Sequence, residues 1–262
     1  MKKLKQIGTY ILLTALVIVS LVTVKTVVLH YTCLDGIAVL GYHDIVSDTD
    51  KKTIYKHNPY KMSVSEFEKQ MRYLAEHQYK TLRMDELYNY LQDTNKPLPK
   101  KAVVITFDDG FENVLTYAYP ILQRYHFHAT SFVIGKKVET NAKGYLQQAQ
   151  LTDDQVMQYA SHSYDLHHKA SGFDRKKIDT LSLEQVREDF TANTPYVKQD
   201  YFAFPYGRSI HGMEELLANE DVKLAFGYNQ NRKVTRNDNM YLLPRFLVAA
   251  QMPFVYFTWI VS

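Results

Sequence analysis

Short apolar runs alternate with amphipathic segments along most of this chain. Runs typical of buried strands lie at 36–45, 102–107, 128–135, 201–204, 223–228 and 242–248. Between them, apolar residues spaced three or four apart predict helices at 63–77, 85–92, 112–125, 152–160, 182–193 and 213–219. Repeated strand-then-helix units favour a parallel sheet that is closed, or nearly closed, as a barrel. The sequence therefore predicts an α/β fold.

The helix expected at 63–77 has a clear start signal. Ser65 and Glu68 have the spacing of a capping box, and Phe67, Met71 and Leu74 share one face. The helix expected at 152–160 leaves no room for a strand before the histidine-rich segment that follows it. It leads directly into the sequence SHSYDLHH, with no strand between them.

The first part of the chain predicts a membrane anchor. Residues 7–24 form an uncharged, mostly apolar run, and Lys2, Lys3 and Lys5 precede it. The positive flank predicts a cytoplasmic N-terminus, with the remainder outside the cell. A cleaved signal peptide is the alternative, but no A-x-A-like cleavage site is present. We expect residues 1–30 to be a single-pass anchor at the cell membrane and residues 31–262 to be an extracellular domain.

The charge balance limits the partners of the outer domain. Residues 1–30 hold four of the 31 basic residues and no acidic ones, which leaves 27 basic against 28 acidic side chains. A domain near neutrality has no basic footprint for nucleic acid. The single cysteine, Cys33, cannot form an internal disulfide, so stability must come from the core. We expect a monomer.

Several polar residues fall where the predicted strands end. These are His43 and Asp44, then Asp108 and Asp109, then Pro205, Tyr206 and Gly207, with His162, His167 and His168 following the helix at 152–160. In parallel barrels the chemistry sits at the carboxyl ends of the strands. The sequence therefore predicts one site built from these residues.

The residue types at those ends suit metal-assisted hydrolysis. Imidazole nitrogens with a carboxylate suit Zn²⁺ or a similar divalent ion, and three protein ligands leave room for a water of lowered pKa. A second carboxylate could then take the proton of that water. Adjacent side chains point in different directions, so Asp108 and Asp109 can divide the two roles.

Three motifs together resemble those of the polysaccharide deacetylases, carbohydrate esterase family 4. They are TFDDG at 106–110, SHSYDLHH at 161–168 and FAFPYG at 202–207. The chain most resembles the poly-β-1,6-N-acetyl-D-glucosamine N-deacetylases of biofilm formation. Its two motif histidines, His162 and His167, have the wider spacing of that subgroup, and a further histidine motif comes early, in GYHDI at 41–45.

The resemblance implies a distorted (β/α)₇ barrel and a role for each motif residue. Asp108 would be the general base and His43 the general acid, while Asp109, His162 and His167 would bind one divalent ion. Zn²⁺ is favoured, with Co²⁺ and Ni²⁺ as alternatives. The backbone N–H of Tyr206 would help to hold the oxyanion, with Pro205 and Gly207 beside it at the substrate. The implied reaction is hydrolysis of N-acetyl groups on an N-acetylglucosamine polysaccharide.

The chain departs from the family pattern at two places. Ala203 stands where the wider family has an arginine, and Arg245 in LLPRFLV is our candidate substitute as the partner of the base. Relative to the family pattern, the stretch before His162 also lacks about one strand, and this would allow the enzyme to have reduced activity.

Three alternatives stay open. A peptidoglycan or chitin-oligomer deacetylase would use the same site. A glycosidase would need two carboxylates flanking a sugar bond and no metal. An inactive polysaccharide-binding relic would follow if the stretch before His162 has disrupted the site.

Overall fold

A parallel sheet forms the centre of the structure, which is a computed structural model describing residues 2–32, 36–97, 99–169, 176–228 and 231–262. Its strands run in the order β10-β1-β5-β6-β7-β8-β9, with β4 also paired to β5. Their bounds are β1 Ala38–Tyr42, β4 Lys80–Thr81, β5 Ala102–Phe107, β6 Ala129–Val133, β7 Met157–Ser161, β8 Tyr201–Ala203, β9 Leu224–Phe226 and β10 Phe246–Leu247. Every pairing between these strands is parallel.

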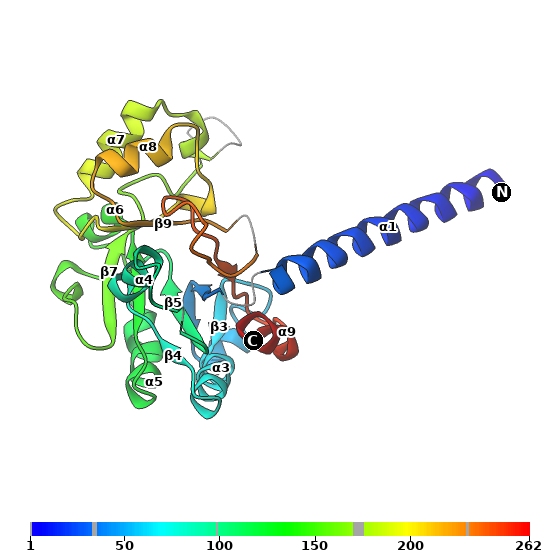
Figure 1. Cartoon of the computed structure of the whole chain (residues 1–262), viewed down its shortest axis with the longest axis horizontal. Helices are drawn as coiled ribbons and strands as arrows, with labels where there is room; N and C mark the ends of the chain where they lie inside the picture. The colour runs from blue at the N-terminus through cyan, green and yellow to red at the C-terminus, as the bar shows by residue number, and fades with distance from the viewer. Residues whose placement is uncertain (1, 33–35, 98, 170–175, 229–230) are drawn as a thin grey trace.

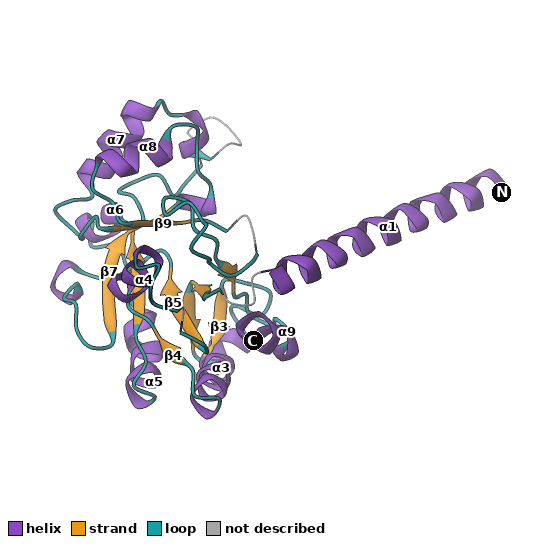
Figure 2. Cartoon of the chain, in the orientation of Figure 1, coloured by secondary structure: helices purple, strands orange, loops and turns teal. Residues whose placement is uncertain are grey.

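Helices surround the sheet (Figure 2). After α1, Lys2–Thr32, they are α2 Asp48–Lys52, α3 Val64–Glu76, α4 Met84–Gln92, α5 Tyr119–Arg124, α6 Gly135–Glu139, α7 Leu183–Ala192, α8 Met213–Asn219 and α9 Phe254–Val261. A π-helical turn, η1 Val114–Ala118, leads into α5, and short 3₁₀ turns are η2 Gln148–Gln150, η3 Lys177–Thr180 and η4 Pro205–Gly207. A separate parallel pair joins β2, Asp44–Val46, to β3, Lys61–Ser63.

The sheet is an incomplete barrel. Leu243 pairs with Phe226 at the end of β9, and a few residues later β10 pairs with β1. The stretch 243–247 therefore contacts β9 at its start and β1 at its end. Among the described residues, β9 and β10 do not pair with each other. The predicted parallel α/β architecture is confirmed in this form.

The core has two layers because side chains alternate across each strand. On β5, Val103 and Ile105 pack in the layer that includes α3 and α5, whereas Val104 packs in the layer inside the barrel. Strands that are buried on both faces read as continuous apolar runs, which explains why the sequence pattern located them. The same alternation continues to the site, where Thr106 and then Asp108 lie on the inner side.

The prediction of a helix at 152–160 is wrong. Asp154 Oδ1 accepts hydrogen bonds from the backbone N–H groups of Val156 and Met157, at 2.7 and 2.8 Å, which turns the chain into β7. Tyr159 then packs on the outer layer and Ala160 on the inner one, the alternation of a strand. The strand that seemed to be missing before His162 is therefore β7 itself, which removes the reason to expect a weakened site.

The predicted cap of the helix at 63–77 is wrong by two residues. Ser63 is the N-cap of α3, and its hydroxyl accepts a hydrogen bond from the backbone N–H of Glu66 at 3.2 Å. The spacing Ser63 to Glu66 also fits a capping signal, so the sequence offered two overlapping start signals. The π-helical turn η1, inside the helix expected at 112–125, was not foreseen either.

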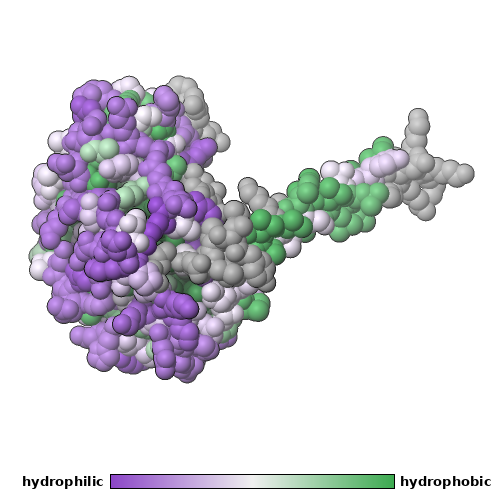
Figure 3. Space-filling model, viewed as in Figure 1, coloured by the Kyte–Doolittle hydropathy of each residue, from purple (hydrophilic) through white to green (hydrophobic). Residues whose placement is uncertain are grey.

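The predicted membrane anchor falls on α1, which extends away from the barrel (Figure 1) and has many exposed apolar side chains (Figure 3). Within the described part of the chain, we find no helix long and apolar enough to cross a membrane. The anchor predicted at 7–24 is therefore not confirmed. Cys33 lies outside the described residues.

Candidate active site

Asp108 and Asp109 lie at the end of β5, where the chain turns sharply. The backbone N–H of Asp108 still bonds across to the carbonyl of Tyr42 in β1, at 3.0 Å. Asp109 then has φ of 76° and Gly110 has φ of 73°. Positive φ is rare for residues other than glycine, although aspartate tolerates it better than most. This turn separates the two carboxylates, so that Asp108 faces Arg245 and Asp109 faces two histidines.

Asp109, His162 and His167 converge on one point. Asp109 Oδ1 lies 3.5 Å from Nε2 of His162 and 3.5 Å from Nε2 of His167. The three potential ligand atoms lie within 4.8 Å of one another, and this is the cluster of metal-ligand type found among the described residues. One carboxylate and two imidazoles form a donor set typical of catalytic zinc sites.

Two buried atoms in this cluster make no hydrogen bond to any described residue. They are Asp109 Oδ1 and His162 Nε2. The other ring nitrogen of His162, Nδ1, donates to the carbonyl of Ala203 at 2.8 Å, which leaves Nε2 facing Asp109 as an acceptor. A backbone partner of this kind fixes the tautomer of a metal-binding histidine. The residues therefore fit a divalent ion, and they are the candidates to hold it.

The electrostatics of the cluster also suit metal binding. Burial lowers the pKa of His167 to about 4, so its ring is neutral near pH 7 and can act as a ligand. Burial alone would raise the pKa of Asp109, but the facing His162 lowers it below its usual value. Burial disfavours the charged form of His162, yet the Asp109 and Asp108 carboxylates raise its pKa on balance. The ionised Asp109 carboxylate and the neutral His167 ring can therefore both act as donors to a cation.

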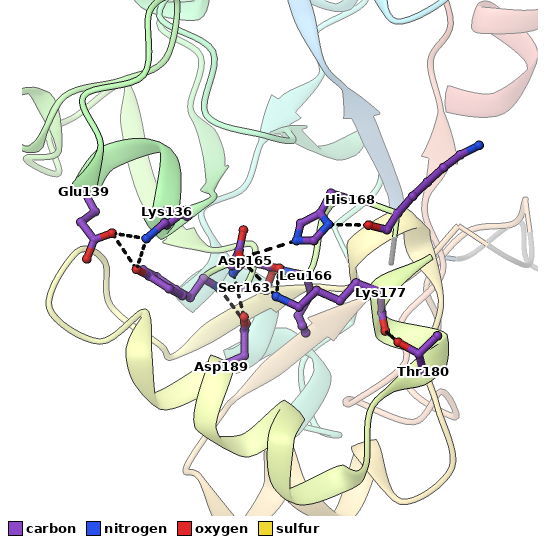
Figure 4. Close-up of polar contacts among 11 residues, drawn as sticks. Lys136, Glu139, Ser163, Asp165, Leu166, His168, Lys177, Thr180 and Asp189 are labelled. Atoms are coloured by element: carbon purple, nitrogen blue, oxygen red, sulfur yellow. Dashed lines mark hydrogen bonds and ion pairs between the residues drawn. The ribbon is translucent and has the colours of Figure 1, made fainter. Parts of the chain in front are cut away.

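A carboxylate on α7 holds the loop that carries the two histidines. Asp189 accepts hydrogen bonds from the backbone N–H groups of Tyr164 and Asp165, at 2.8 and 2.7 Å (Figure 4). Lys177 reaches the same loop through the carbonyl and carboxylate of Asp165, at 3.0 and 3.1 Å. His168, in contrast, faces Asp165 at 3.5 Å and is exposed. His168 therefore lies apart from the metal cluster.

Arg245 and Asp108 form a buried ion pair. Arg245 Nη1 lies 2.7 Å from Asp108 Oδ1, and Nη2 lies 2.9 Å from Oδ2, in a two-pronged geometry. Their side chains are 0% and 2% exposed. Burial alone would raise the pKa of Asp108, but the Arg245 guanidinium holds it well below its usual range. Asp108 is therefore an ionised carboxylate, the form that a general base needs.

His43 occupies the junction between β1 and β2. Its ring centroid lies 4.8 Å from that of Tyr60 and 6.2 Å from that of Tyr228, stacked at 18° to the latter. Burial lowers the pKa of His43, with Asp108 opposing the shift. Its neighbour in sequence, Asp44, pairs with Lys61 instead and lies outside the cavity lining.

A cavity of about 400 Å³ joins these groups. It is lined by His43, Asn58, Tyr60, Lys61, Asp108, Asp109, Phe111, His167, Lys176, Tyr206, Tyr228 and Leu247. Tyr206 has φ of 59° within η4, and its ring stacks on His167 with centroids 4.2 Å apart. Pro205 and Gly207 are buried and do not line the cavity.

A polysaccharide deacetylase family model matches residues 95–225, half of the chain. The chain belongs to the polysaccharide deacetylase family. Enzymes of this family are hydrolases that act on the amide bonds of N-acetyl groups.

Named relatives and solved structures agree with this membership. The deacetylase is 29% identical over 205 residues to a poly-beta-1,6-N-acetyl-D-glucosamine N-deacetylase of Staphylococcus aureus, covering 72% of this chain and 68% of the relative. It resembles the structure of IcaB from Ammonifex degensii with a TM-score of 0.70 at 26% identity, covering 87% and 98% of the two chains. The Streptococcus pyogenes deacetylase PplD, solved with acetate, shares the fold with a TM-score of 0.69 at 22% identity and the same coverage.

Sequence reasoning missed seven residues that line the cavity of this deacetylase. They are Asn58, Tyr60, Lys61, Phe111, Lys176, Tyr228 and Leu247. Tyr228 ends the run 223–228, so the rule that chemistry lies at strand ends could have found it. Lys61 begins β3 and Tyr60 directly precedes it, and this strand of three residues has no pattern of its own.

Loss of a ligand should empty the metal site. We expect Asp109→Ala, His162→Ala and His167→Ala each to lose tightly bound metal, since each removes one of three donors. His168→Ala is the matched control and should keep its metal, because its ring faces Asp165. Elemental analysis of the purified variants measures this directly. Full metal occupancy in the His162 or His167 variant would contradict the assignment.

Changing Arg245 should alter the pH dependence of turnover. Arg245→Lys cannot reproduce the two-pronged pairing, and we expect turnover to fall about 10- to 100-fold, the effect of one charge-assisted hydrogen bond. In Arg245→Ala the pKa of Asp108 rises, so the acidic limb of the pH–rate profile should move to higher pH. Removing one partner of a buried pair also costs about 3–5 kcal/mol of stability, visible as a lower melting temperature.

The exposed Arg187 on α7, paired with Glu220 at 3.6 Å, supplies the control for this experiment. Arg187→Lys should leave turnover and the pH profile unchanged. An unmoved acidic limb with retained turnover in the Arg245 variants would make Arg245 a purely structural residue.

Proposed function

We propose that this deacetylase removes N-acetyl groups from poly-β-1,6-N-acetyl-D-glucosamine, leaving a partly deacetylated polymer for biofilm formation. The observation that carries the proposal is the composition of the cavity, because one cavity is lined by His43, Asp108, Asp109 and His167. The early position of His43, directly after β1, is the feature that marks the biofilm subgroup in sequence. The named Staphylococcus aureus relative supports the same substrate.

The two aspartates would have different tasks in this reaction. A divalent ion held by Asp109, His162 and His167, which we infer to be Zn²⁺, would polarise the acetyl carbonyl and lower the pKa of a water. Asp108 would take the proton of that water as it attacks the carbonyl carbon. The Arg245 ion pair supports this role because it keeps Asp108 ionised in a buried place.

His43 would complete the reaction on the leaving-group side. As the C–N bond breaks, His43 donates a proton to the amine nitrogen, and the products are acetate and a glucosamine unit. Burial lowers the pKa of His43, and the nearby Asp108 and Asp109 carboxylates oppose this shift and favour the protonated ring that a general acid needs. The backbone N–H of Tyr206 would stabilise the oxyanion, and the stacking of its ring on His167 fixes it at the site.

The cavity supports a polymer substrate. Its volume of about 400 Å³ is at the small end of ligand sites, which suits a single sugar with its acetyl group. Tyr60 is 51% exposed and lies over His43, so it offers an aromatic surface to a neighbouring sugar.

We place the domain outside the cell because the proposed substrate is a cell-surface polysaccharide. Proteolysis of intact cells tests this location.

Removing the base or the acid should stop chemistry but leave metal bound. We expect Asp108→Asn and His43→Ala each to lower kcat by roughly 10²–10⁴, the usual contribution of general acid–base catalysis. Both variants should keep their metal, because neither side chain belongs to the ligand cluster. A His43→Ala variant with near-normal turnover would show that the acid lies elsewhere.

Acetate release from three polymers tests the substrate. We expect the purified chain to release acetate faster from poly-β-1,6-N-acetyl-D-glucosamine than from chitin oligomers or peptidoglycan, without shortening any of them. Chelation should abolish the release, and Zn²⁺, Co²⁺ or Ni²⁺ should restore it. A preference for peptidoglycan or chitin oligomers would overturn the proposed substrate, chain cleavage would indicate a glycosidase, and no release from any polymer would favour a binding protein.

A further inference from the structure

Tyr228, two residues after β9, contacts the base and the two groups around it. Its hydroxyl donates a hydrogen bond to Asp108 Oδ2 at 2.9 Å. The guanidinium carbon of Arg245 lies 4.1 Å from the centre of its ring, and the ring of His43 stacks at 6.2 Å. One side chain beyond β9 therefore hydrogen-bonds to Asp108, packs on its charge partner Arg245 and lies beside the His43 ring.

The hydrogen bonds to Asp108 are distributed unequally between its two oxygens. Oδ2 accepts two, from Arg245 Nη2 and from the Tyr228 hydroxyl, whereas Oδ1 accepts one, from Arg245 Nη1. Each oxygen of a carboxylate has about two lone pairs available for hydrogen bonds. Among the described residues, the free acceptor capacity therefore lies on Oδ1. The Tyr228 hydroxyl therefore occupies the second acceptor position of Oδ2.

Two neighbouring positions leave the space that Tyr228 fills. A Cβ added at Gly41, on β1, would lie 2.1 Å from the Tyr228 hydroxyl oxygen. A Cβ added at Gly207, in η4, would lie 2.8 Å from the Tyr228 Cβ and backbone nitrogen. Gly207 also has φ of 66°, a backbone conformation that residues with a side chain rarely adopt. One position on β1 and one in η4 thus lack side chains where this tyrosine packs.

We propose that Tyr228 is a positioning residue for the general base of the deacetylation. Its hydroxyl occupies Oδ2 and holds the Asp108 carboxylate in place, so that Oδ1 takes the proton of the attacking water. Its ring keeps Arg245 in the plane of the carboxylate and sets the distance between Asp108 and His43. The inference rests on the proposed role of Asp108 as the base.

The variant Tyr228→Phe separates positioning from packing. It keeps the ring against Arg245 and His43 and removes only the hydroxyl. We expect kcat for acetate release from poly-β-1,6-N-acetyl-D-glucosamine to fall about 10- to 100-fold, as for one hydrogen bond to a charged group. KM and bound metal should stay unchanged, because the hydroxyl touches neither the ligand cluster nor, in this proposal, the substrate.

Tyr79→Phe is the matched control. The Tyr79 hydroxyl also donates one hydrogen bond, to the carbonyl of Val261 at 3.0 Å, and the residue does not line the catalytic cavity. This variant should keep the kcat of the wild type. An equal fall in both variants would show a general loss of stability and would overturn the proposal.

A double variant shows whether Tyr228 acts through Asp108. In an Asp108→Asn background, Tyr228→Phe should have little further effect on the residual kcat, since groups that act as a unit are not additive. Full additivity, an unchanged kcat in Tyr228→Phe alone, or a change confined to KM would each overturn the positioning role. If Asp108→Asn itself keeps wild-type turnover, the proposed base is wrong, and that result is distinct from a failure at Tyr228.

Discussion

The buried ion pair between Arg245 and Asp108 is the interaction on which the site depends. Moving two charges from water into a barrel interior costs several kcal/mol per ion, and only good geometry and further hydrogen bonds offset that cost. Here the guanidinium binds both carboxylate oxygens and also donates to Thr106 at 3.1 Å. The pair joins the end of β5 to the residue before β10, so the pairing of β10 with β1 also places the cation beside the base.

The two adjacent aspartates differ in environment because one backbone turn separates them. Asp108 lies at the inner end of β5, where it is kept ionised by a fixed cation. Asp109, in the left-handed region, faces two histidine nitrogens and has an oxygen without a hydrogen bond. One carboxylate is therefore neutralised by the protein itself, while the other retains capacity for an external cation. This division suits a site where one group is to accept a proton and the other is to bind metal.

The rim of the cavity depends on a second ion pair. Asp44 and Lys61 face each other across β2 and β3, and the Lys61 ammonium also lies 4.6 Å from the ring of Phe111. Burial raises the pKa of Asp44, partly offset by Lys61. This contact fixes the segment that places Tyr60 over His43. The part of the cavity lining formed by Tyr60 and Lys61 is therefore held by pairing between two strands of three residues each.

The sequence by itself determined the buried strands, the motif residues at their ends and the family they resemble, because burial on both faces gives continuous apolar runs. It failed at β7, where Asp154 directs the chain into a strand through backbone hydrogen bonds that a helix-like spacing conceals. It offered Arg245 as a candidate partner of Asp108, but 137 positions separate the two, and only the pairing of β10 with β1, beside β5, brings them together. The strand-end rule could have included Tyr228 as a candidate, but its contacts appear only in the tertiary structure, since they depend on space left at Gly41 and Gly207, and no local pattern records the space between distant segments.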